Sequence, residues 1–210
     1  LIALGTVLFA GCTTGPTADE QAAMVETARK ASAMLAQTLG GELKNAMAGK
    51  GPEGTLRLQD AASQIAADVS KRFGMDVKRV SPKNRNPAGV PDAREAGAQA
   101  GLEKRLAAGE MPGTLDAWQV VTAPTGKVFR YARASPTQPL CLSGDPAAMA
   151  EGVKARLAAD YPLDKATGYS AGMVRGIIPI NRPRDDDVKF APEGFSFPAC
   201  GRFLLLKSVN

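Results

Sequence analysis

The chain has 210 residues, of which 44% are apolar, and this length and composition are typical of one globular domain with appendages. Only 5% of the residues are aromatic, so we expect a core of alanine, leucine, valine and methionine. The formal net charge is +5, but the basic residues are scattered and not interleaved with aromatic residues, so we expect no nucleic-acid partner.

The N-terminus resembles the end of a bacterial signal peptide. Residues 1–11 are apolar and end in small residues before Cys12, as in a lipobox, where the cysteine becomes acylated. We therefore expect a partial signal peptide over 1–11 and a lipid-anchored tether over 12–17. The protein would then lie on the periplasmic or cell-surface side, anchored to the membrane, and to the outer membrane if the cell has two. The alternative is an uncleaved signal with an incidental cysteine.

Two helices are predicted over 18–74. Thr17 and Glu20 form a capping-box pattern, and the apolar residues that follow keep helical spacing, which predicts a long helix over 18–48. Three residues that include two glycines should end this helix, and Pro52 should begin a second helix that ends near Phe73. We expect the two helices to pack as an antiparallel pair over one face of a sheet. Dimerisation through the long helix is the alternative.

The rest of the chain, 75–210, predicts an antiparallel sheet flanked by helices, and hence an α+β fold. The clearest signal is a hairpin whose two strands alternate apolar and polar residues around a short Pro-Thr-Gly turn. A glycine inside the last strand, Gly176, indicates a bulge. The expected strands are 75–80, 115–122, 127–134 and 173–180, and the expected helices are 92–108 and 145–160.

Two loops carry the residues from which we expect a binding site. Arg85 and Asn86 lie on a proline-rich loop, and a guanidinium can hold a carboxylate through two hydrogen bonds. That carboxylate belongs either to a ligand or to the protein itself, for example Asp164. Tyr161 and Tyr169, with Arg175, line a small pocket or else close the end of the sheet, and the sequence leaves this choice open.

The same two loops carry a family resemblance. Arg85, Asn86 and Pro87 match an Arg-Asn-Pro signature, and the segment from Tyr161 to Tyr169 matches Tyr-Pro-x-Asp-x-Ala-x-Gly-Tyr. Together, over roughly 75–180, they resemble a family of extracytoplasmic PAS-like sensor domains, many of which carry a c-type haem. The resemblance implies a PAS-like fold with a long N-terminal helix or helical pair, and a sensory or ligand-binding role.

The chain departs from this family at the haem attachment motif. A Cys-x-x-Cys-His-Gly motif usually lies where this chain has Cys141-Leu142-Ser143-Gly144, and the chain contains no histidine at all. Two thioether bonds and an imidazole ligand are therefore impossible. We expect no cofactor, with haem held in another way as the alternative.

Once Cys12 is assigned to the lipid anchor, Cys141 and Cys200 remain. In an oxidising compartment we expect these two cysteines to form a disulfide. The alternatives are two free thiols, or Cys141 retained as a metal or haem ligand.

The sequence gives little support for catalysis, metal binding or nucleotide binding. Without histidine, the usual catalytic triads and histidine metal sites are excluded, and no phosphate-binding loop or dinucleotide-binding glycine pattern is present. The consecutive carboxylates Asp185–Asp187 lack the alternate spacing of a calcium loop, and we interpret them as a solvated turn. We expect no enzyme activity and no metal site.

The preferred interpretation is a lipid-anchored extracytoplasmic PAS-like sensory or ligand-binding lipoprotein without covalent haem. Its partners would be the membrane, through the lipid anchor, and an unidentified small ligand or protein. One alternative is a haem or redox protein with altered ligation through Cys141 or a methionine such as Met149 or Met173. Another is a structural or assembly lipoprotein in which side chains fill the pocket.

Overall fold

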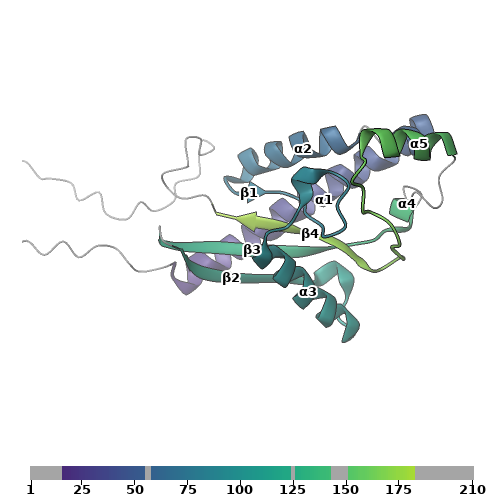
Figure 1. Cartoon of the computed structure of the whole chain (residues 1–210). Coiled ribbons are helices and arrows are strands. Elements are labelled where there is room, and N and C mark those ends of the chain that lie inside the picture. Colours follow the sequence, from purple (N-terminus) through teal and green to yellow (C-terminus); the bar gives the residue numbers. More distant parts are fainter. Residues whose placement is uncertain (1–15, 55–57, 124–125, 143–150, 183–210) are drawn as a thin grey trace, which may run out of the picture.

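Four β-strands form one antiparallel sheet in the order β1-β4-β3-β2. The computed structural model describes residues 16–54, 58–123, 126–142 and 151–182 (Figure 1). The predicted signal peptide, Cys12, Met149, Asp185–Asp187 and Cys200 lie outside these ranges. The strands are β1 (Asp76–Val77), β2 (Asp116–Ala123), β3 (Gly126–Pro136) and β4 (Val174–Asn181).

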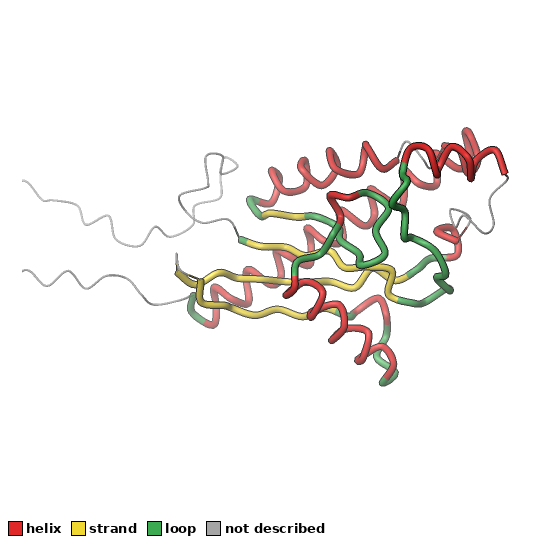
Figure 2. The backbone as a smooth tube through the Cα atoms, viewed as in Figure 1, coloured by secondary structure: helices red, strands yellow, loops and turns green. Residues whose placement is uncertain are grey.

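Helices cover both faces of the sheet (Figures 1 and 2). On one face, α1 (Ala18–Gly54) contacts β3 and β4, and α2 (Leu58–Phe73) turns back along α1. On the other face, α3 (Ala93–Ala107) contacts β2, β3 and β4. The shorter elements are η1 (Pro87–Gly89), η2 (Pro112–Thr114), α4 (Pro139–Leu142) and α5 (Glu151–Asp160).

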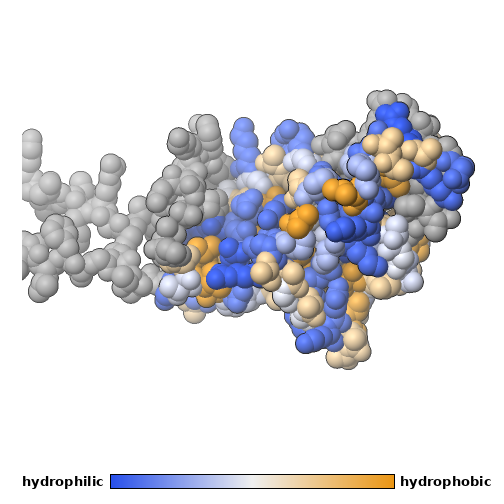
Figure 3. Space-filling view, in the orientation of Figure 1, coloured by the Kyte–Doolittle hydropathy of each residue, from blue (hydrophilic) through white to orange (hydrophobic). Residues whose placement is uncertain are grey.

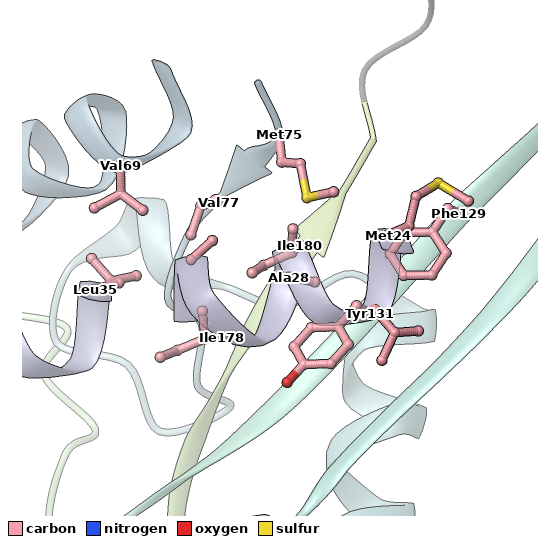
Figure 4. Packing of buried hydrophobic residues seen from close by; sticks show 12 residues of the cluster. Met24, Ala28, Leu35, Val69, Met75, Val77, Phe129, Tyr131, Ile178 and Ile180 are labelled. Atoms are coloured by element: carbon pink, nitrogen blue, oxygen red, sulfur yellow. The ribbon is translucent and has the colours of Figure 1, made fainter. Parts of the chain in front are cut away.

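The pleat of β3 and β4 divides the core into two clusters, because successive side chains of a strand point to opposite faces. The cluster on the α1 side is shown in Figure 4, where Tyr131 and Ile178 point from the sheet toward α1. Their neighbours Ala132 and Ile177 belong to the cluster on the α3 side. The α1-side cluster also includes Met24, Ala28, Leu35, Val69, Met75, Val77, Phe129 and Ile180, and the α3-side cluster includes Val80, Leu102, Leu115, Ala134 and Val174.

One carboxylate fastens α1 to the hairpin. Asp116, at the start of β2, accepts a hydrogen bond from Arg29 Nε at 2.7 Å and another from the Tyr131 hydroxyl at 3.1 Å. Tyr131 is buried, and withdrawal from water raises the pKa of its hydroxyl to about 12, so it stays protonated as a donor.

The predicted α+β fold, the antiparallel sheet, the helical pair and the hairpin are confirmed. Both capping boxes are also present, since Thr17 and Glu20 exchange hydrogen bonds, as do Asp92 and Glu95. The boundary between the first two helices was wrong. α1 continues through the glycines to Gly54, because glycine weakens a helix by only about 1 kcal/mol and packing against a neighbouring helix can offset that.

The first strand was also predicted too long. Regular pairing covers only Asp76 and Val77, after which Val80 forms a single isolated bridge to Ile177. The expected start of the helix before Asp160 lies outside the described residues, and the helix is described only from Glu151.

The surface view is largely hydrophilic, with small hydrophobic spots (Figure 3). Among the described residues, none of the helices is both long enough and apolar enough to cross a membrane. In the ranges that the structure describes, the large apolar side chains that remain exposed are Val90, Met111, Trp118, Leu163 and Met173.

Strand β4 passes very close to the backbone at Val80. The main-chain N–H groups of Val80 and Ile177 each donate to the other residue's carbonyl at 3.0 Å. A Cβ at Gly176 would collide with the Val80 carbonyl oxygen, so only glycine fits at this position. The expected bulge is present beside it, because Ser135 pairs with Gly176 and Pro136 with Val174, which leaves Arg175 as the extra residue.

Replacing Gly176 by alanine should therefore destabilise the protein by more than about 2 kcal/mol, since backbone atoms must move to admit the methyl group. Urea unfolding of the two proteins measures this change. Gly101→Ala is the matched control, because Gly101 lies in α3 with nothing near its added Cβ, and it should leave stability unchanged or slightly higher. Equal stability of both variants would contradict the close approach.

Candidate functional site

Two adjoining hollows lie between the helical pair and the sheet, each with a volume of about 520 Å³. The first is bordered by α2, β1 and the loop that follows β1, and the second by α1, the end of β3 and α4. Both are bordered by Leu39 of α1 and by three arginines, Arg79, Arg85 and Arg175. The apolar residues around them include Leu35, Leu43, Leu58, Val77 and Ile178.

Arg85 forms a buried ion pair. Its Nε donates to Asp164 at 2.9 Å, and the exposed fractions of the two side chains are only 7% and 9%. The other Asp164 oxygen accepts the Ala166 N–H at 2.8 Å. The sequence left open whether Arg85 pairs with a carboxylate of a ligand or of the protein, and in the structure its partner is the protein's own Asp164. This ion pair connects the loop after β1 to the loop before β4.

Asn86 stabilises the same loop through hydrogen bonds. Its side-chain oxygen accepts the Ala88 N–H at 2.9 Å and caps η1, while its carbonyl accepts from Asn84 at 3.0 Å. Asn84 in turn accepts the Lys165 N–H through its carbonyl at 3.0 Å. These contacts hold the Arg-Asn-Pro segment against the Tyr-Pro segment, so the two sequence motifs meet in space.

Tyr169 supports the wall of the first hollow. Its hydroxyl lies 3.1 Å from the Ser81 hydroxyl and donates to the Arg175 carbonyl at 3.1 Å. The Lys83 ammonium and the Arg175 guanidinium lie 5.3 and 5.1 Å from the centre of its ring, within the range of cation–π contacts. Tyr169 therefore contacts both the carbonyl and the guanidinium of Arg175 and helps to position this arginine. Tyr169 does not itself border either hollow.

The bulge in β4 sets the direction of Arg175. As the extra residue of the bulge, Arg175 is released from the regular pairing of β4 and β3. Its Nη1 donates to the Cys141 carbonyl at 2.9 Å, so it connects β4 to α4 across the second hollow. Cys141 also borders that hollow and is half-buried.

Arg79 is a site residue that the sequence reasoning missed. It borders both hollows, and within the described part of the chain no group forms a hydrogen bond or ion pair with its guanidinium. Withdrawal from bulk water lowers the pKa of Arg79, and the positive charge of Arg175 lowers it further. By its accessible surface, however, Arg79 is an exposed residue, so its guanidinium meets water in the hollows that it borders.

A sequence signal for Arg79 was available. Residues at i and i+2 of an extended segment share a face, and Val77 belongs to the α1-side core, so alternation places Arg79 on the same side of the sheet. A basic residue at such a position points either to a buried partner or to a ligand.

The remaining predicted residues are placed as follows. Tyr161 follows α5 and borders neither hollow, and the role of Tyr161 in ligand binding stays a prediction. Cys141 forms no disulfide within the described part of the chain, and because Cys200 lies outside it the bridge stays a prediction. No cluster of three or more His, Cys, Asp or Glu side chains that could hold a metal ion occurs among the described residues.

The model of a family described as Tll0287-like matches residues 16–183. The chain belongs to the Tll0287-like family. This confirms the family resemblance that the Arg-Asn-Pro and Tyr-Pro motifs indicated. The crystal structure of the cyanobacterial heme-protein Tll0287 is similar, with a TM-score of 0.53 and 23% sequence identity over 80% of this chain and 98% of that chain. No curated protein matches the chain.

At this level of identity the Tll0287 structure establishes a shared fold, and a haem site in this Tll0287-like chain has to be tested on its own residues. The whole sequence contains no histidine, and Cys141 is the only cysteine or methionine among the described residues that border the two hollows. Met173 lies elsewhere, with its sulfur accepting the Ser170 N–H at 3.2 Å. These residues do not fit a haem attached by two thioether bonds and ligated by imidazole.

The buried Arg85–Asp164 pair yields a stability prediction. Asp164→Asn keeps an acceptor for the Ala166 N–H but removes the negative charge that faces the buried guanidinium, and should cost about 3–5 kcal/mol in urea unfolding. Glu26→Gln is the control, because the Glu26–Lys30 pair is exposed and should be worth less than about 1 kcal/mol. Similar small effects for both variants would show that the 164 carboxylate does not stabilise the loops.

Proposed function

We propose that this Tll0287-like protein is a lipid-anchored extracytoplasmic sensory or ligand-binding lipoprotein that binds a small molecule without covalent haem. The observation that carries the proposal is the pair of adjoining hollows between α1 and the sheet, which share three arginines and Leu39 and of which the second has a mainly apolar lining. Binding sites for small molecules are concave, mostly apolar and furnished with a few convergent polar groups. This arrangement supports a ligand-binding role over the alternative in which side chains fill the pocket.

The proposed anchor rests on the lipobox-like sequence before Cys12. The capped start of α1 at Thr17 follows only a few residues later, so a lipid at Cys12 would hold the domain close to the membrane surface. The compartment, the anchor and a protein that receives the signal are all parts of the proposal.

A variant that fills the shared part of the hollows tests the ligand-binding role. We expect the full chain, purified from a bacterial host, to retain a small molecule that is detected by native mass spectrometry and by extraction. Leu39→Trp should reduce the bound fraction at least about tenfold, because Leu39 borders both hollows and a bulkier side chain occupies the space.

Leu163→Trp is the matched control, since Leu163 is exposed and borders neither hollow, and it should bind like the unchanged protein. A protein that retains no small molecule from lysate or from added ligand libraries, or a Leu39→Trp variant that binds as well as the control, would contradict the proposal.

A second candidate function is non-covalent haem binding with Cys141 as the iron ligand. It is favoured by the position of Cys141 beside the second hollow and by the similarity of the fold to that of the heme-protein Tll0287. A cysteine thiolate is an established haem ligand. A bound haem would supply redox or gas-binding chemistry, while the chain itself would contribute the thiolate and the surrounding arginines.

Titration with hemin separates the two candidates. If the preferred proposal holds, absorption spectra of the protein with hemin should equal the sum of the separate spectra. A stable complex with a shifted Soret band that changes in Cys141→Ala, but not in the exposed variant Met173→Ala, would establish the second candidate instead.

A further inference from the structure

The direction of the Arg79 side chain follows from its neighbours. Lys78 forms an ion pair with Glu95 of α3 at 2.9 Å, and Val80 belongs to the α3-side core. Because successive side chains of an extended segment alternate, Arg79 points to the other face, toward α1 and the two hollows.

The charges around the hollows do not balance. Asp76 is the only acidic residue among the described residues that border them, and it is exposed. Two of the basic residues there have carboxylate partners, since Lys78 pairs with Glu95 and Arg85 with Asp164.

Four basic residues that border the hollows have no described carboxylate partner, namely Arg79, Lys83, Arg133 and Arg175. Three of them donate to main-chain carbonyls: Lys83 to Thr167, Arg133 to Gly113 and Arg175 to Cys141. Within the described part of the chain Arg79 alone has neither a hydrogen bond nor a carboxylate partner, and the positive charge of Arg175 repels it.

An exposed guanidinium whose donors have no partner in the described chain, beside a second positive charge, favours an anion that supplies both negative charge and hydrogen-bond acceptors. The planar fork of arginine suits carboxylate, sulfonate or phosphate groups that accept two hydrogen bonds. The apolar side chains of Leu35, Leu39 and Ile178 lie around the same hollows and suit an apolar body.

We propose that Arg79, with Arg175 beside it, binds the anionic group of an amphipathic ligand whose apolar body lies along α1. This inference rests on the ligand-binding function proposed above and adds the chemical class of the ligand. Arg85 is not part of the anion site, because Asp164 already faces it at 2.9 Å.

Two fluorescent dyes that share an apolar ring system but differ in charge test the inference. The sulfonated dye 1-anilinonaphthalene-8-sulfonate carries an anionic group, and N-phenyl-1-naphthylamine is its uncharged counterpart. Both are titrated into the full chain in detergent-free buffer. Arg79→Gln should weaken binding of the sulfonated dye at least about tenfold, as expected for hydrogen bonds to a charged group, and should leave the uncharged dye unchanged.

Arg72→Gln is the matched control, because Arg72 lies exposed in the last turn of α2 and borders neither hollow. It removes the same charge from the chain and should leave the binding of both dyes unchanged. A control that loses as much affinity as Arg79→Gln would show that overall charge is responsible and would overturn the inference.

The remaining outcomes separate the two proposals. If Arg79→Gln binds the sulfonated dye normally, or weakens both dyes equally, the anion site is wrong while the ligand-binding function stands. If neither dye binds the unchanged protein, the proposed function itself fails.

Discussion

The close approach between Val80 and strand β4 is the constraint from which the arrangement of the hollows follows. Two reciprocal main-chain hydrogen bonds join Val80 to Ile177, and they form only because residue 176 has no side chain. The same crossing places Arg79 one residue before the contact and Arg175 in the bulge beside it. One backbone contact therefore brings together two like charges that are almost one hundred residues apart in the sequence.

The arginines around the hollows show how one residue type serves opposite purposes. Arg85 forms a buried ion pair with Asp164, and this pair holds two loops together. Removing both charged groups from water costs desolvation free energy. Arg79 has no such internal partner among the described residues and borders both hollows, so its guanidinium is available to a ligand.

Much of the fold could be predicted from local patterns. The hairpin and the capping boxes were found because alternation, turn residues and caps lie within a few residues of each other. The end of α1 was missed because glycine propensity is weak beside helix packing, and the length of β1 because its pairing depends on distant β4. Strand alternation from Val77 indicates only the side on which Arg79 lies, and the hollows that it borders are formed by α1 and β4 together, which no local pattern predicts.

The pairing of β1 with β4 also bears on how the chain reaches this structure. Asp76 lies opposite Asn181, 105 residues later, so the sheet cannot close until nearly the whole described domain has been synthesised. Contacts between distant residues form slowly. Until then only the β2–β3 hairpin is available to cover the apolar side of α1, through Phe129 and Tyr131 of β3. A newly made chain therefore leaves the part of this core that Ile178 and Ile180 fill open to solvent until the last strand is in place.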